Sequence, residues 1–168
     1  MDVLGHWALQ QEAARREVLA AFGEAVQGSD GTIDRRALGA VVFREPGQLR
    51  RLEAILHPRM VARLEELLEG SAPRTVINAA ILFRMGLERY CDFVICVRAP
   101  LWARLRRARR RDGLGLLAAL RRLAAQRGIC PKTYDKAVDI YYVDNRRDLG
   151  WLERQAAGIL KRREIEVR

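Results

Sequence analysis

Arginine is concentrated in one short segment, where six of the eight residues from 104 to 111 are arginines. A guanidinium is always charged at neutral pH, and its forked N–H donors match the oxygens of a phosphate group. The segment therefore predicts contact with the phosphates of a nucleotide or of a nucleic acid by some of its arginines, while most of them should lie on a solvated face of a helix. Its members are Arg104, Arg106, Arg107, Arg109, Arg110 and Arg111.

The chain as a whole is also basic. Its 168 residues include 31 Lys and Arg against 21 Asp and Glu, which gives a formal net charge of +10. Such a surface attracts polyanions: nucleotides, nucleic acids or an anionic membrane surface. Hydrophobic residues make up 49% of the chain and charged residues 31%. This composition indicates one globular domain with a core and excludes a disordered chain.

The sequence also carries signals about the compartment. No run of eighteen apolar residues is present, so we expect no membrane span. Residues 1–6 lack the basic-then-apolar pattern of a signal peptide. Cys91, Cys96 and Cys130 form an odd set without the spacing of metal ligands. We therefore expect a cytoplasmic protein with reduced thiols.

Helical periodicity dominates the first half of the chain. Residues 7–22 predict one helix that ends at Gly23, and Asp34 is placed to cap a short helix after it. Pro46 suits the first turn of the next helix, where its missing N–H has no cost. Pro58 should kink or interrupt that helix.

Short apolar runs alternate with helical patterns in the second half. Residues 75–79, 93–97 and 140–143 are rich in β-branched and aromatic types, which predicts buried parallel strands. The alternation of strands and helices predicts an α/β fold with a parallel sheet. The helical patterns lie at about 100–111, 114–127 and 148–163, the last with Asp148 as its expected N-cap.

Four segments, taken in order, resemble the dephospho-CoA kinase family. The first is D-V-L-G-H at residues 2–6, and the second spans residues 22–58 and ends in L-E-A-I-L-H-P. The third is V-I-N-A-A-I-L-F-R-M-G-L at residues 76–87. The fourth, residues 91–145, includes R-D-G and V-D-N. The resemblance covers essentially the whole chain, which is identified on these motifs as a member of the family.

The resemblance implies an ATP-dependent kinase with Mg²⁺. Its reaction would be phosphorylation of the ribose 3′-hydroxyl of dephospho-CoA, the last step of coenzyme A biosynthesis. The implied fold is the three-layer α/β fold of P-loop kinases, as a single domain over residues 1–168. Residues 7–70 would form a helical acceptor-binding part and residues 100–135 a mobile lid. The implied partners are small molecules, with no membrane and no nucleic acid.

The resemblance also implies roles for six residues. Asp2 would orient the acceptor hydroxyl and take its proton. A structural alternative stays open for most of the others: a half-buried helix position for His6, packing for His57, and a turn for Asn145. The implied roles are substrate binding for His6 and His57, ATP-phosphate binding for Arg111, adenine binding for Asn145, and support of Mg²⁺ for Asn78.

The sequence departs from the family pattern in two ways. It contains no G-x-x-G-x-G-K followed by Ser or Thr, so we expect a chain that lacks the first strand, the P-loop and the first helix. Loss of that unit should reduce phosphoryl transfer by many orders of magnitude. In addition, Asn78, Ala80 and Arg84 stand where the family has Asp, Pro and Glu.

Two further interpretations stay open. The departures from the pattern also suit a catalytically silent paralogue that binds CoA or a nucleotide and has a regulatory role. The arginine segment suits a nucleic-acid-binding protein, although no recognition motif is present and aromatic residues for base stacking are scarce near the arginines.

Overall fold

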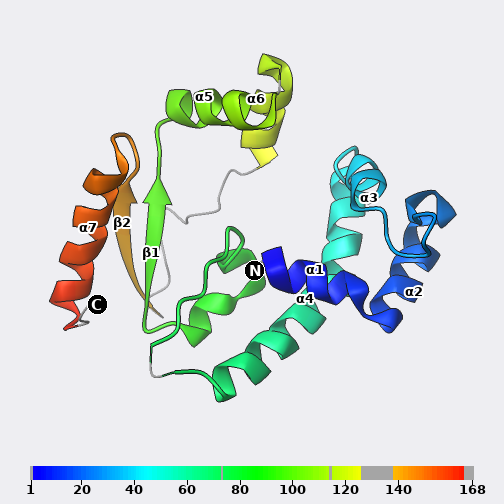
Figure 1. Cartoon of the computed structure of the whole chain (residues 1–168), viewed down its shortest axis with the longest axis horizontal. Helices are drawn as coiled ribbons and strands as arrows, with labels where there is room; N and C mark the ends of the chain where they lie inside the picture. The colour runs from blue at the N-terminus through cyan, green and yellow to red at the C-terminus, as the bar shows by residue number, and fades with distance from the viewer. Residues whose placement is uncertain (1, 73, 114, 126–137, 165–168) are drawn as a thin grey trace. The chain divides into compact units, whose positions relative to one another are not determined.

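The computed structural model describes residues 2–72, 74–113, 115–125 and 138–164. The chain divides into two compact units, Met1–Ala80 and Ile81–Arg168. The first unit is built of helices, and the second contains a parallel sheet with helices (Figure 1). The predicted α/β class with a parallel sheet is therefore confirmed. Among the described residues, no helix combines the length and apolar character needed to span a membrane.

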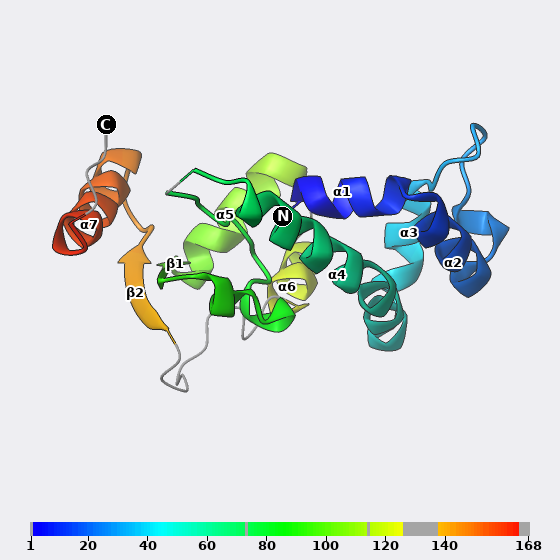
Figure 2. The same ribbon diagram turned by 90° about the horizontal axis from the view of Figure 1, so that it is seen from below.

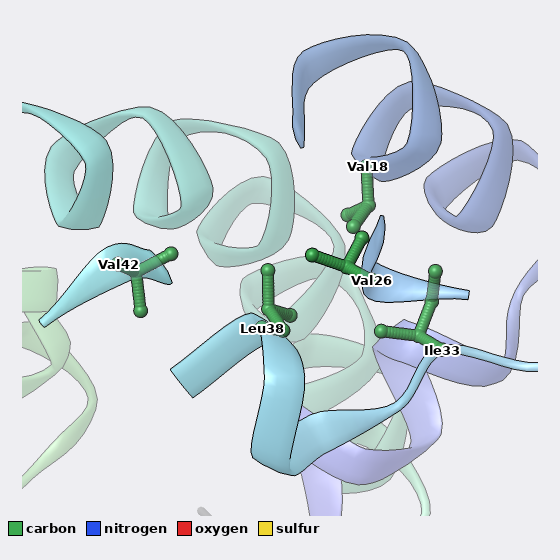
Figure 3. Close-up of a cluster of buried hydrophobic side chains, with 5 residues drawn as sticks. All are labelled: Val18, Val26, Ile33, Leu38 and Val42. Carbon is green, nitrogen blue, oxygen red and sulfur yellow. The ribbon is translucent and has the colours of Figure 1, made fainter. Parts of the chain in front are cut away.

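Buried aliphatic side chains hold the first unit together. Figure 3 shows Val18, Val26 and Leu38 gathered between its elements, and each is at most 2% exposed. Burying one such side chain stabilises the fold by about 1.5–3 kcal/mol. The elements of this unit are α1 (Asp2–Gln10), α2 (Glu12–Phe22), the short 3-10 helix η1 (Glu24–Val26), α3 (Arg35–Val42) and α4 (Pro46–Glu69).

Two predicted helix boundaries are confirmed in this unit. Asp34 caps α3, because its Oδ1 accepts hydrogen bonds from the backbone N–H groups of Arg36, at 2.8 Å, and Ala37, at 3.1 Å. Gly23 ends α2 with a φ of 79°, which favours glycine.

The prediction of one helix over residues 7–22 is wrong. Gln11 has an extended backbone, with φ −67° and ψ 131°, and separates α1 from α2. Both flanking segments have good helix formers, so local propensity gives no sign of the break. The break lets α2 bury Ala14 and Val18, and tertiary packing of this kind overrides propensity.

Pro58 lies inside α4 and does not interrupt it. A proline in a helix removes one backbone hydrogen bond and costs about 3 kcal/mol. Burial on both sides of the proline offsets this cost, since Leu56 is 8% exposed and Met60 and Leu64 are each 6% exposed. The expected interruption is therefore wrong, and the helix carries His57 in its middle.

The second unit is organised around two parallel strands. Strand β1 pairs with β2 in parallel, from Phe93 opposite Asp139 to Arg98 opposite Asp144. Strands are thus confirmed at the predicted runs 93–97 and 140–143. The elements of this unit are η2 (Phe83–Met85), η3 (Leu87–Tyr90), β1 (Phe93–Arg98), α5 (Leu101–Asp112), α6 (Leu116–Ala125), β2 (Asp139–Asp144) and α7 (Leu149–Arg162).

The remaining predicted strand, residues 75–79, is not a strand in the structure. Val76 there is 90% exposed. A strand exists only through hydrogen bonds to a neighbouring strand, and within the described part of the chain this segment pairs with none. The apolar, β-branched composition shows that the segment is suited to a buried strand. It does not show whether a neighbouring strand is present to pair with it.

Helix α7 is fixed to the end of β2 by polar contacts. Gln155 accepts a hydrogen bond from the backbone N–H of Asp144 and donates one to its carbonyl oxygen, both at 3.0 Å. Asp148 caps the helix as predicted, with its Oδ1 2.8 Å from the backbone nitrogen of Trp151. These contacts fix the short connection 145–148 that carries the predicted site residue Asn145.

Candidate functional site

Helices α1 and α4 position the acceptor-side residues of the first unit. Figures 1 and 2 show α1 lying against α4. Gly5 lies at this contact: a Cβ atom at its position would be 3.8 Å from Cε of Met60, an ordinary van der Waals distance. A second contact places the guanidinium of Arg63 5.7 Å from the ring centre of Trp7. This cation–π contact ties the same two helices together.

Both predicted substrate-binding histidines lie next to this helix contact. His6 directly follows Gly5, and His57 lies one turn before Met60. His6 is exposed, and its Nε2 is 3.1 Å from Nε2 of Gln10. The structural alternative for His6, a half-buried helix position, is therefore wrong, because α1 turns this residue to solvent. His57 is half-buried in α4.

Arg59 stabilises the helix turn that contains His57 and Pro58. Its Nη1 donates to the carbonyl oxygen of Ile55 at 2.6 Å, one turn back along α4. Its Nη2 also forms an ion pair with Glu17 of α2 at 2.7 Å. The carbonyl of Ile55 is the ordinary helix acceptor of the backbone N–H of Arg59, so the side chain adds a second donor to it and does not replace the bond that Pro58 removes from Ala54. The contact also fixes α2 to the middle of α4.

A second group of polar residues lies at the carboxyl ends of β1 and β2. The backbone N–H of Asn145 donates to the carbonyl oxygen of Arg98 at 2.7 Å. Nη2 of Arg107, on α5, donates to both the backbone oxygen and Oδ1 of Asn145, each at 3.0 Å. Arg98 also stacks on Tyr142, with its guanidinium carbon 3.4 Å from the ring centre. This end of a parallel sheet is where open α/β proteins bind their ligands.

Sequence reasoning missed the part that Arg107 plays here. A solvated helix face is the expectation for most arginines of the segment, yet Arg107 contacts Asn145. The sequence contained one sign that Arg107 lies near the predicted site: it is four residues from Arg111, so the two arginines share a face of α5.

The structure assigns backbone positions to the other predicted residues. Asp2 is the first residue of α1, and Arg111 is in the last turn of α5. Asn78 is exposed in the segment without helix or strand. Arg84 is exposed in η2, and Ala80 ends the first unit. Part of the predicted lid, residues 126–135, lies outside the described residues, as does Cys130.

The described side chains do not form a magnesium cage on their own. Within the described ranges, no three His, Cys, Asp or Glu residues gather as metal ligands. In kinases Mg²⁺ is bound mainly by one or two carboxylates and the substrate phosphates. Asn78 offers a neutral amide oxygen that suits a hydrogen bond from metal-bound water, but it lacks the negative charge of the Asp in the family pattern.

Parallel strands followed by helices, with basic and amide side chains at their carboxyl ends, define a class of α/β nucleotide-binding proteins. Comparison with known proteins narrows this class. The family model described as dephospho-CoA kinase matches residues 1–147. The chain belongs to the dephospho-CoA kinase family.

Individual relatives agree with this membership. The dephospho-CoA kinase of Geobacter metallireducens is 39% identical over 155 residues, which cover 89% of this chain and 75% of that protein. The one from Deinococcus radiodurans is 38% identical over 168 residues, covering 98% and 79%. The family assignment made from the four sequence segments is thus confirmed.

Solved structures share the fold. A protein from Thermus thermophilus, 35% identical, superposes with a TM-score of 0.72 over 96% of this chain and 81% of its own. The dephospho-CoA kinase of Campylobacter jejuni, 26% identical, gives a TM-score of 0.58 over 95% and 81%. As a member of this family, the chain is a kinase by relationship, with ATP as the expected phosphoryl donor.

Proposed function

We propose that this chain supplies the acceptor-binding and lid parts of an ATP-dependent kinase that phosphorylates the ribose 3′-hydroxyl of dephospho-CoA. The match of the family model to residues 1–147 carries the proposal. The sequence motifs add to it, because each implied site residue lies in a segment that matches the family pattern. The proposed compartment is the cytoplasm.

Asp2 acts as the proton acceptor in the proposed reaction. The 3′-oxygen of dephospho-CoA attacks the γ-phosphorus of ATP and gives its proton to the Asp2 carboxylate. A new O–P bond forms, and the bond from the γ-phosphorus to the bridging oxygen breaks with its electrons on ADP. A positioned base contributes about 10²–10⁴-fold to such a step.

His6 and His57 bind the acceptor, and Arg111 of α5 binds the donor. The helix contact at Gly5 and Met60 supports this assignment, since it brings both histidine-bearing turns together. Arg111 neutralises ATP phosphates with a permanent charge. Mg²⁺, when bound, would neutralise charge that develops on the phosphates, and Asn78 would support it through a hydrogen bond from a metal-bound water.

Phosphoryl transfer also needs a phosphate-binding loop, which the 168-residue sequence does not contain. The backbone N–H groups of such a loop, its Lys and its Ser or Thr together hold the phosphates and Mg²⁺. We therefore propose that activity requires a segment upstream of these residues, and that this segment also pairs with residues 75–79.

Three substitutions favour a second candidate function. Asn78, Ala80 and Arg84 replace residues that the family pattern has in one short stretch. A chain with these changes suits a catalytically silent module that binds CoA or a nucleotide and regulates another protein.

One assay separates the two candidates. Conversion of dephospho-CoA to CoA with ATP is measured for this chain and for a version extended upstream in its own coding sequence. Activity in the extended version alone supports the kinase. If both chains bind dephospho-CoA and neither converts it, the silent module is correct, and Asn78→Asp with Arg84→Glu should restore turnover.

A further inference from the structure

The polar groups of Asn145 are almost all committed to contacts within the second unit. Its backbone N–H donates to Arg98, and its backbone oxygen accepts from Arg107. Its side-chain Oδ1 accepts from the same Nη2 of Arg107, at 3.0 Å. Of the polar groups of Asn145, only the side-chain Nδ2 has no hydrogen-bond partner within the described part of the chain.

Arg107 also determines which way the Asn145 amide faces. The oxygen and nitrogen of an asparagine side chain have nearly the same shape, and the hydrogen-bond network decides between them. A guanidinium carries donors only, so the atom that faces it must be the oxygen. The group left for a ligand is therefore a pure donor with two N–H bonds.

We propose that Arg107 fixes the side-chain amide of Asn145 so that it offers only hydrogen-bond donors to the nucleotide base. This orientation determines the preference for adenine over guanine. The Watson–Crick edge of adenine has an unprotonated ring nitrogen, N1, which accepts a hydrogen bond from Nδ2. Guanine has an N1–H donor at the same place, and two donors that face each other repel. Rejection of a ligand by an unmatched polar group is how such sites discriminate.

This inference rests on the proposed function, because it takes Asn145 as the adenine-binding residue. It adds a residue and a mechanism that the family motif does not contain. Arg107 itself does not contact the base: it is a positioning residue that acts through the side chain of Asn145. Its removal should therefore change the selectivity for the base more than the strength of phosphate binding.

The test is a titration of the upstream-extended chain, which has the phosphate-binding loop, with ATP and, separately, with GTP, with the Asn145 side-chain amide followed by NMR. In the wild-type chain, we expect ATP to shift the Nδ2 protons and GTP to bind at least about tenfold more weakly, the effect of one matched hydrogen bond. In Arg107→Leu the amide can rotate and offer its oxygen to guanine. The ATP-to-GTP ratio of dissociation constants should then approach one.

Two further variants serve as controls. Arg107→Lys retains a donor toward Oδ1 and should preserve most of the selectivity. Arg106→Leu removes an arginine of α5 for which no contact with Asn145 is present, and it should leave the ratio unchanged. The unfolding temperature of each variant shows whether the second unit remains folded.

Two results would overturn the inference. One is an Arg107→Leu chain that keeps the wild-type ATP-to-GTP ratio while ATP still shifts the Asn145 amide. The other is a wild-type chain whose Asn145 amide does not respond to ATP. Neither result contradicts the proposed function. That function fails only if the upstream-extended chain does not phosphorylate dephospho-CoA.

Discussion

Arg59 and Glu17 join the middle of α4 to α2 through two contacts between the guanidinium and the carboxylate. Nη2 of Arg59 is 2.7 Å from Oε1 of Glu17, and Nη1 is 3.3 Å from Oε2. The Arg59 side chain is 27% exposed, so solvent screens this pair less than an ordinary surface pair. The same guanidinium caps the carbonyl oxygen of Ile55, beside the helix proline.

Replacing Arg59 should therefore destabilise the first unit. We expect Arg59→Ala to lower the free energy of unfolding by about 1–2 kcal/mol, because it removes a partly buried ion pair with Glu17 and the packing of the arginine stem between two helices. Urea unfolding followed by circular dichroism measures the change. Arg16→Ala is the matched control, since its pair with Glu12 is exposed on both sides and should cost at most about 0.5 kcal/mol. Equal losses in the two variants would contradict the assigned role.

The cap at Asp34 gives a second stability prediction. Asp34→Ala leaves the N–H groups of Arg36 and Ala37 without their acceptor and should cost about 0.5–2 kcal/mol. Asp34→Ser can accept the same hydrogen bonds and should recover most of the loss. Thermal unfolding of the three proteins tests this, and an alanine variant as stable as the wild type would show that the cap contributes nothing.

The thiol of Cys91 should react slowly with alkylating reagents. Burial raises its pKa above the ordinary value, and the neighbouring carboxylates of Asp92 and Glu88 raise it further. The thiolate is the reactive form, so a raised pKa means less of it at a given pH. The rate of iodoacetamide labelling at this site should keep increasing above pH ~8.5, where an ordinary thiol is half ionised.

Peptide mapping by mass spectrometry distinguishes Cys91 from Cys96, which is buried, and from Cys130. Asp92→Asn removes one negative charge beside the thiol and should increase the labelling rate at pH 8. Labelling of Cys91 that levels off below pH 8 would mean that its pKa is not raised.

His57 gives a prediction about the acceptor. If it binds dephospho-CoA, His57→Ala in an active, upstream-extended chain should raise KM for dephospho-CoA about tenfold and leave kcat near the wild-type value. KM for ATP should not change. A variant that only loses stability, with both KM values unchanged, would assign His57 to packing, which is the structural alternative.

Local signals in the sequence were sufficient to predict most of the strands and helices of the second unit. Strands β1 and β2 form short runs of β-branched and aromatic residues, and Asp148 is the N-cap of α7 as its position predicts. These features depend on a few neighbouring residues, so the pattern contains what is needed to find them. The parallel pairing followed from the alternation of strands and helices.

The wrong predictions all depend on contacts outside the local segment. Residues 75–79 have strand composition, but a strand also needs a neighbour. The continuity of α4 through Pro58 depends on burial of the residues on both sides of it, which pack against other helices. The Arg107–Asn145 contact joins residues 38 positions apart, and no periodicity in the sequence predicts it.

The most direct test of the account is the position of the phosphate that the kinase transfers. The upstream-extended chain is incubated with dephospho-CoA and ATP, and the product is examined by ³¹P NMR. We predict a phosphomonoester on the ribose 3′-oxygen, formed in proportion to ADP, and a decrease in kcat of about 10²–10⁴-fold in Asp2→Asn. ATP consumption without a 3′-phosphate, or an Asp2→Asn variant with full kcat, would contradict the proposed reaction or the role of Asp2 in it.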